Sequence, residues 1–150
     1  MGTRALFTVT LLDGSEPFRH YRRWDGYPDA VLPDLAAALA VPGLADALAA
    51  ARRVDQLATP TPEDRIKYSD WAEQVSAGPD REYYALLRKQ QGDLAAMTAS
   101  GIIVTTDGPI RRQAFDYLVD FPAGTVTVAE DGGPKTVLSF DQLTDEYAHQ

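Results

Sequence analysis

The chain contains no cysteine among its 150 residues. This absence excludes thiol nucleophiles, cysteine-ligated zinc, iron–sulfur clusters and disulfide frameworks, and it favours a reducing compartment. Histidine is almost as scarce, since only His20 and His149 occur. His149 is the second-last residue, where side chains are seldom held firmly, so a histidine-dependent active site would have to use His20.

The standard catalytic and nucleotide-binding motifs are also missing. The chain has no G-x-S-x-G nucleophile turn, no G-x-x-x-x-G-K-[S/T] phosphate loop, no G-x-G-x-x-G fingerprint and no H-E-x-x-H zinc helix. No serine lies in a recognisable nucleophile turn that would work with His20. We therefore do not expect serine-type hydrolysis or any of the reactions that these motifs support.

Long apolar runs are missing as well. The longest stretch of low charge, residues 35–51, is interrupted by proline, glycine and aspartate, so it is not expected to span a bilayer. Residues 1–4 show no basic segment followed by an apolar one, which argues against a signal peptide, and Leu6 breaks the myristoylation pattern. These observations favour a soluble, cytoplasmic protein that does not contact a membrane.

Basic residues are outnumbered, because 14 Lys and Arg face 22 Asp and Glu, giving a net charge of −8. The small basic excess lies in residues 1–28, and the rest of the chain is strongly acidic. Binding to double-stranded nucleic acid needs a basic footprint, so we do not expect it. With 45% hydrophobic and 24% charged residues, the chain is typical of a single globular domain covering residues 1–150.

The beginning of the chain predicts a β-hairpin. Residues 4–12 are apolar or β-branched, and the odd positions form one apolar face. Residues 13–15 form a turn signal, and residues 18–24 alternate as a second strand. The Asp-Gly-Tyr-Pro sequence at 25–28 ends that strand, because glycine permits unusual φ angles and proline cannot donate a backbone hydrogen bond.

The middle of the chain predicts four helices. The first is expected to begin at Pro33-Asp34 and to stop at Pro42-Gly43, and the second to cover residues 44–54. The third is expected to begin with Thr61 as its N-cap and to run to residue 79. The fourth is expected over residues 80–101, with a glycine at its end.

The end of the chain predicts a β-meander followed by a short helix. Strands are expected at 102–105, 115–121, 125–128 and 135–138, and Ser139-Phe140-Asp141-Gln142 matches a helix capping box. Strands and helices are thus segregated along the chain. This segregation predicts an α+β fold with an antiparallel sheet, built from the N-terminal hairpin and the C-terminal meander, with the helical middle segment packed on one face.

The segment from residue 18 to residue 28 is the most unusual part of the chain. It combines arginines, a histidine and large aromatic residues. Arginine holds carboxylate or phosphate through paired hydrogen bonds, and aromatic rings stack on bases or guanidinium groups. The candidate ligand-binding residues are therefore Arg4, His20, Arg22, Arg23, Trp24, Asp25 and Tyr27.

A structural interpretation of the same segment stays open. Aromatic residues on a strand commonly belong to the core, exposed arginines discourage edge-to-edge strand pairing, and a lone histidine is commonly structural. A weaker hypothesis places Asp25, Asp29 and Asp34 around a hard cation such as Mg²⁺ or Ca²⁺. Their spacing matches no EF-hand loop, and Asp34 is equally explained as a first-turn helix residue. We therefore expect no metal and no cofactor.

Three hypotheses about function follow. The first is a non-catalytic binding module that recognises an anionic small molecule or an acidic segment of a partner. The second is a small enzyme acting on a phosphorylated or nucleotide-like substrate, with His20 or Asp25 as the base and Arg4, Arg22 or Arg23 stabilising negative charge. The third is a structural protein that self-associates through the apolar helix faces of residues 44–54.

Two stretches of the chain resemble a group of small uncharacterised bacterial and phage proteins. They are the opening Met1-Gly2-Thr3-Arg4-Ala5-Leu6 and the element Tyr21-Arg22-Arg23-Trp24-Asp25-Gly26-Tyr27-Pro28. The layout of 115–119, 124–128 and 139–143 is similar as well. The resemblance implies one shared fold, and a shared feature built from Arg4, Asp25, Gly26, Tyr27 and Pro28. It implies no activity.

Overall fold

The computed structural model describes residues 3–67, 83, 86, 87, 90–106, 113–131 and 133–147. Its strands are β1 (Ala5–Thr10), β2 (Phe18–Arg22), β3 (Arg52–Asp55), β4 (Ile102–Thr105), β5 (Phe115–Asp120), β6 (Thr125–Glu130) and β7 (Lys135–Ser139). Its helices are α1 (Pro28–Leu39), α2 (Leu44–Ala50), α3 (Pro62–Lys67), α6 (Leu94–Ser100) and α7 (Phe140–Tyr147). This order of elements confirms the α+β class.

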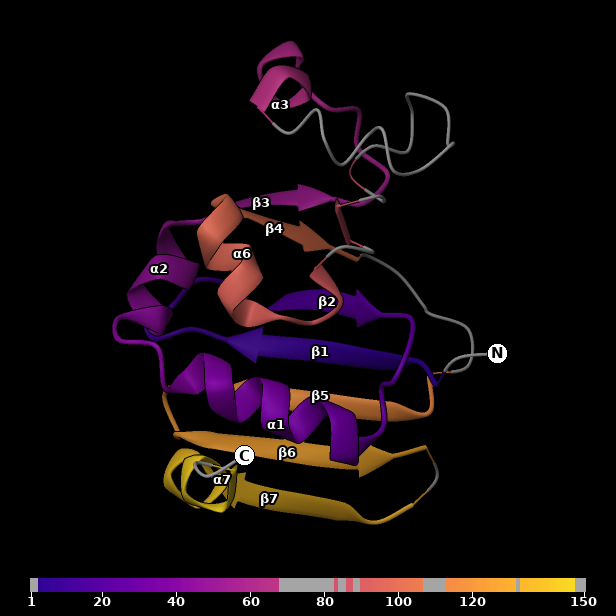
Figure 1. The fold of residues 1–150 in the computed structure, drawn as a ribbon, viewed down its shortest axis with the longest axis vertical. Helices are drawn as coiled ribbons and strands as arrows, with labels where there is room; N and C mark the ends of the chain where they lie inside the picture. The colour runs from indigo at the N-terminus through magenta and orange to yellow at the C-terminus, as the bar shows by residue number, and fades with distance from the viewer. Residues whose placement is uncertain are drawn as a thin grey trace.

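Five strands form the main sheet in the order β2-β1-β5-β6-β7 (Figure 1). The neighbouring strands are antiparallel except β1 and β5, which are parallel. The sheet is therefore mostly antiparallel, as predicted, but its central pairing is not. A long connection explains the difference: the chain passes through the whole helical middle between β1 and β5, and a crossover of that kind is what parallel pairing requires.

A second, two-stranded sheet is formed by β3 and β4, which run parallel. It lies beside β2, where the Thr106 N–H donates to the Arg19 carbonyl at 2.9 Å. The prediction of one helix over residues 44–54 is therefore wrong. Helix α2 ends at Ala50 and the chain becomes extended at Ala51 (φ −68°, ψ 143°), because pairing with β4 buries Val54.

The helices α1 and α7 cover one face of the main sheet, as the ribbon drawing shows (Figure 1), which confirms the predicted packing of the helical segment. The inward residues of β1 pack there in alternation, as the apolar pattern predicts. Phe7 of β1 is fully buried and stacks on Tyr117 of β5, with 5.2 Å between the ring centroids. The opposite face carries the more exposed residues, including Leu118 at 38%.

The helix ends agree with some of the predicted capping signals and differ from others. Helix α1 begins at Pro28 and not at Pro33, which lies inside the helix. The two prolines are equally suited to a first helical turn, so the pattern alone did not separate them. Thr61 caps α3 as predicted, since its Oγ1 accepts the Asp64 N–H at 3.1 Å. The predicted continuation of this helix to residue 79 lies outside the described residues.

The predicted helix over 80–101 is interrupted. Gln91 and Gly92 take positive φ angles (46° and 77°), and Asp93 then caps α6 by accepting the N–H groups of Ala95 and Ala96. The predicted stop at Gly101 is confirmed by its φ of 72°. The capping box at the start of α7 is also confirmed, because Ser139 and Gln142 exchange side-chain to backbone hydrogen bonds of 2.8 and 3.0 Å.

Over the ranges that the structure describes, no single helix is long and apolar enough to cross a membrane; only α1 and α2 taken together reach that length and hydropathy, and they meet at a bend of 92°.

Candidate functional site

The hairpin determines which way each predicted site residue faces. Its strands pair with Ala5 opposite Arg22 and Phe7 opposite His20, so Arg4 lies at the same end of the sheet as Arg23. Along β2, side chains alternate between the two faces of the sheet. His20 and Arg22 are buried on the inner face, whereas Arg23 follows the strand and is less buried. The predicted cluster is therefore divided by the pleat of a single strand.

His20 is fully enclosed and uses both of its ring nitrogens within the protein. Nδ1 lies 2.8 Å from the Val104 carbonyl, and Nε2 accepts the Gly92 N–H at 3.0 Å. These partners require the neutral ring with its proton on Nδ1. Burial lowers the pKa of His20 to about 4. Because neither nitrogen faces solvent, the ring links β2 to β4 and to the turn before α6, and the geometry gives it no access to a substrate.

Arg22 is 8% exposed, and its charge is paired internally. Its Nε donates to the Trp24 carbonyl at 2.9 Å, and its Nη1 donates to Asp34 Oδ2 at 3.0 Å. The prediction that Arg22 faces an open anion site is not supported, because the carboxylate that it holds belongs to α1. Asp34, which the sequence placed in the first turn of a helix, is instead the partner that ties α1 to the end of β2.

The residues that remain at the surface form what we call the β2–α1 corner, residues 23–27. Trp24 and Tyr27 are each 41% exposed, and the Arg23 guanidinium lies 5.4 Å from the centre of the Trp24 ring. Asp25 is exposed and has a φ of 54°, an unusual angle for a residue other than glycine. His20 and Asp25 therefore lie in different surroundings, one in the core and one on the corner.

The backbone of the corner is held by three other segments. Gln91 Oε1 accepts the N–H groups of both Arg23 (3.0 Å) and Trp24 (3.3 Å). The Gly26 N–H donates to the Thr3 carbonyl at 2.9 Å, and the Tyr117 hydroxyl donates to the Gly26 carbonyl at 2.7 Å. Burial raises the pKa of Tyr117, so this hydroxyl stays a donor. These hydrogen bonds fix the backbone of the corner, and nothing in the sequence around Gln91 indicated this role.

Close packing around position 26 explains why the Asp-Gly-Tyr-Pro element has a glycine there. A Cβ atom at this position would lie 2.8 Å from the Ala5 Cβ and 2.9 Å from the Thr3 carbonyl oxygen, both closer than real contacts allow. Tyr27 then precedes the first residue of α1 with an extended backbone, and Pro28 begins the helix. Residues 25–28 therefore form a tight junction between β1, β2 and α1.

A second polar cluster, which the sequence did not single out, lies beside the two-stranded sheet. Arg52 Nη2 donates to both carboxylate oxygens of Asp64, at 2.6 and 2.5 Å, and the Tyr83 hydroxyl donates to the same carboxylate. Burial alone would raise the pKa of Asp64, but these donors outweigh it and hold the pKa below its usual value. A hollow of about 490 Å³ adjoins Arg52 and Asp64. The cluster joins α3 to β3 as an internally satisfied network.

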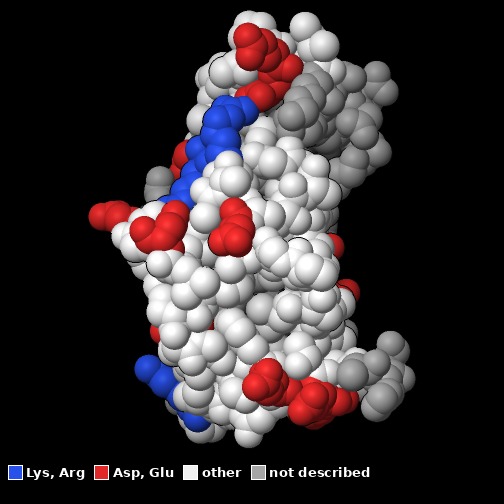
Figure 2. Space-filling view, turned by 90° about the vertical axis from the view of Figure 1, so that its left-hand side faces the viewer, with Lys and Arg blue, Asp and Glu red and all other residues white. Residues whose placement is uncertain are grey.

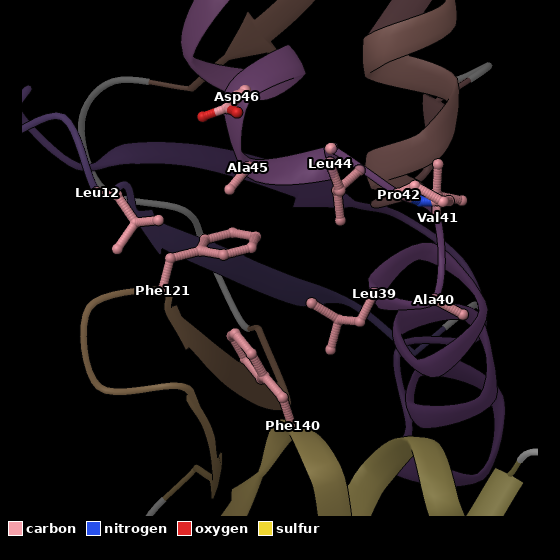
Figure 3. Close-up of a pocket in the computed structure, with 11 residues that line it drawn as sticks. Leu12, Leu39, Ala40, Val41, Pro42, Leu44, Ala45, Asp46, Phe121 and Phe140 are labelled. Carbon is pink, nitrogen blue, oxygen red and sulfur yellow. The ribbon is translucent and has the colours of Figure 1, made fainter.

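An apolar hollow of about 410 Å³ lies just beyond the end of β1, at the end of the main sheet opposite the β2–α1 corner (Figure 3). It is lined by Leu12, Leu39, Ala40, Val41, Pro42, Gly43, Leu44, Ala45, Asp46, Phe121 and Phe140. Leu12 is 63% exposed and Val41 42% exposed, although both are apolar. The Phe121 and Phe140 rings meet edge to face, with centroids 5.4 Å apart. We refer to this feature as the apolar hollow.

The described residues provide no group of three or more His, Asp or Glu side chains placed to hold a metal ion. Of the three aspartates considered from the sequence, Asp34 is paired with Arg22. Comparison with known proteins adds no assignment: no family model, no curated protein and no solved structure matches this chain.

Proposed function

We propose that the chain is a non-catalytic binding module whose recognition surface is the β2–α1 corner, and that it binds an acidic segment of a protein partner. One observation carries the proposal. Two half-exposed aromatic side chains, Trp24 and Tyr27, stand beside the Arg23 guanidinium on a loop whose backbone is fixed by hydrogen bonds. Tryptophan, tyrosine and arginine are the residues that dominate binding energies at protein interfaces.

The rigid backbone supports recognition because little order has to be gained on binding. A loop that is already fixed in its bound shape does not lose conformational entropy when a partner arrives. The Arg23 guanidinium places positive charge beside the Trp24 ring, and the two rings supply apolar area with few rotatable bonds. A partner segment fits this corner better than a small molecule, because small-molecule sites are concave and enclose their ligand.

The alternative of a small enzyme has little support from the geometry. It needed His20 or Asp25 as a base beside several arginines, yet His20 is enclosed and Arg22 is already bound to Asp34. The absence of cysteine and the net charge of −8 support a cytoplasmic setting and a protein partner in preference to nucleic acid.

Selection from a displayed library of random peptides tests this proposal. The wild-type chain is the bait, and the Trp24→Ala chain is used to remove peptides that bind elsewhere. We expect the selected peptides to be rich in Asp and Glu and to bind the Trp24→Ala and Arg23→Ala variants at least about tenfold more weakly. Leu118→Ala is the matched control, because Leu118 is similarly exposed (38%) on the open sheet face. Selected peptides that bind Trp24→Ala as tightly as the wild type would refute the proposed surface.

A further inference from the structure

We infer that the side chain of Gln91 occupies, from within the chain, the place where a carboxylate of the partner binds, and that the partner displaces it. The inference rests on the proposed function, because it concerns the same β2–α1 corner. It is carried by a pair of adjacent backbone N–H groups, those of Arg23 and Trp24, which both donate to one oxygen, Oε1 of Gln91.

Two neighbouring N–H groups that point at one oxygen form a small anion-binding site. Peptide N–H groups carry partial positive charge, and successive ones that converge favour a negatively charged oxygen between them. The distances to Gln91 Oε1 are 3.0 Å from the Arg23 nitrogen and 3.3 Å from the Trp24 nitrogen. Gln91 offers only a neutral amide oxygen. A carboxylate oxygen in the same place would accept charge-assisted hydrogen bonds, which are roughly twice as strong.

The two N–H groups can be reached by a partner because they lie at the surface of the corner. The hydrogen bond from the Trp24 N–H is exposed, and the bond from the Arg23 N–H is partly buried. The Trp24 ring beside them is 41% exposed, and the Arg23 guanidinium lies 5.4 Å from its centre. Asp25 is exposed on the same corner and offsets part of this positive charge. The two directed N–H groups, and not the net charge, therefore define where a carboxylate binds.

The Gln91 side chain can leave without moving the backbone that carries it. The Gln91 N–H donates to the Leu87 carbonyl at 3.0 Å, and the following N–H, that of Gly92, donates to the buried Nε2 of His20 at 3.0 Å. The corner keeps its hydrogen bonds to Thr3 and to the Tyr117 hydroxyl. Exchange therefore needs only the rotation of one side chain, which is a fast motion. A carboxylate that replaces Oε1 satisfies the same two donors, so the corner stays fixed in the bound state.

Arg52 and Arg53 of β3 provide a contrast to this site. At the end of the molecule opposite the corner, where β3 begins, a basic band lies between acidic side chains (Figure 2). Arg52 is paired with Asp64, and Arg53 donates to the Glu16 carbonyl and to Ser15 Oγ. A carboxylate that arrives there meets acidic side chains and guanidinium groups that are already bound. The corner differs because an uncharged side chain, which a carboxylate can replace, holds its two donors.

Acetate is the simplest probe, and backbone amide signals in NMR follow its binding when it replaces chloride at constant ionic strength. Gln91→Ala removes the internal acceptor and keeps a residue other than glycine at the positive φ of 46°. We expect acetate to shift the Arg23 and Trp24 signals of this variant saturably. The wild type should need at least about tenfold more acetate, because a site that is open about 10% of the time or less loses apparent affinity by that factor. Gln142→Ala, which removes a glutamine that accepts the Ser139 N–H, should respond at the corner like the wild type.

The acidic peptides selected with the wild-type chain test the same site with a larger ligand. We expect Gln91→Ala to bind them at least about tenfold more tightly than the wild type. Gln91→Glu should bind them more weakly, because its own carboxylate takes the place of theirs. Its Arg23 and Trp24 amide protons should also move downfield without any ligand, which charge repulsion at a distance does not produce, and this measurement decides if Gln91→Ala does not fold. A glutamine that only braced the corner would act in the opposite direction, since its removal would weaken binding.

Arg23 and Trp24 signals that do not respond to acetate in Gln91→Ala overturn the inference, as does peptide binding that is unchanged or weaker in that variant. Failure of the proposed function looks different, because the selected peptides then bind Trp24→Ala as tightly as the wild type. If the peptides lose affinity for Trp24→Ala but bind Gln91→Ala and the wild type equally, the corner remains a recognition surface and only the carboxylate site is excluded.

Discussion

Acid should destabilise this protein through the protonation of one buried side chain, His20. In the folded state its pKa is lowered from 6.5 to about 4, chiefly because burial disfavours the charged ring. The Gly92 N–H points at Nε2, so a proton on that nitrogen would place two donors against each other. The unfolded chain takes up the proton freely. The folding free energy that depends on a neutral His20 is therefore fully present above pH 6.5 and is lost as the pH falls toward 4.

The size of the effect follows from the difference between the two pKa values. Each unit is equivalent to 1.36 kcal/mol, so a shift from 6.5 to about 4 corresponds to about 3 kcal/mol. That is a large fraction of the stability of an ordinary domain, which is about 5–15 kcal/mol. Most of the loss should be complete by pH 4.5.

Urea unfolding of the wild type and of His20→Gln at several values between pH 7.5 and pH 4.5 measures this contribution. Carboxylates that titrate in the same range affect both chains, so they cancel in the difference between the two free energies of unfolding. We expect the wild-type advantage at pH 7.5 to shrink by about 2.5 kcal/mol by pH 4.5. A difference that stays constant with pH would refute the reasoning.

NMR of the imidazole nitrogens provides a check that does not depend on the stability of the variant. The chain has only two histidines, so His149→Ala assigns the signals without ambiguity. We expect His20 to stay neutral at pH 5.5 with its proton on Nδ1, because the Val104 carbonyl accepts that proton. A protonated His20 ring at pH 5.5, in a chain that is still folded, would contradict the structure.

Three further predictions concern stability and are measured by urea unfolding at pH 7. Gly92→Ala should lower the free energy of unfolding by at least about 2 kcal/mol more than Gly43→Ala does. Both glycines have positive φ, but only a Cβ at position 92 would meet the Phe7 ring, at 2.6 Å. Equal losses would show that the turn moves away freely. Asp64→Asn should lower the free energy of unfolding by about 1–3 kcal/mol, because the buried carboxylate accepts hydrogen bonds from Arg52 and Tyr83. The pKa of Asp64 is lowered in the folded state, so this contribution should fade as the pH falls below about 4. An unchanged urea midpoint would mean that the network adds nothing. Ser139→Ala should cost about 1 kcal/mol by removing half of the capping box, and a loss below about 0.3 kcal/mol would make the cap unimportant.

The parts of the fold that could be predicted from the sequence are those determined by local chemistry. The hairpin, the β5–β6–β7 part of the meander and the final helix were predicted because alternating residues and capping side chains act over a few positions; β4, expected as the first strand of the meander, pairs with β3 instead. The parallel pairing of β1 with β5 and the small sheet of β3 and β4 were not predicted, because strands far apart in the chain carry no local mark of their partner. Arg52–Asp55 follows helix α2 with no proline or glycine between them, and its extended state depends on pairing with the distant strand β4.

The sequence indicated which segment contains the candidate site, but not how the side chains of that segment are arranged. The sequence showed that residues 18–28 are rich in arginine and aromatic side chains, and the exposed Trp24 and Tyr27 lie there. It did not show that His20 and Arg22 face inward, that Asp34 pairs with Arg22, or that Gln91 accepts the backbone N–H groups of Arg23 and Trp24. Those partners come from distant segments, so composition within one segment overestimated how much positive charge is available to a ligand.

The position of β1 between β2 and β5 affects how the chain can be made in a cell. Ala5–Thr10 leaves the ribosome long before its second neighbour, β5, which begins at Phe115. Until that strand emerges, the growing hairpin carries an open edge with Phe7 and Val9 beside it, which favours pairing with other chains. Fragments that stop before β5 should therefore aggregate or depend on chaperones, and the synthesis of β5 decides whether β1 is enclosed on both sides.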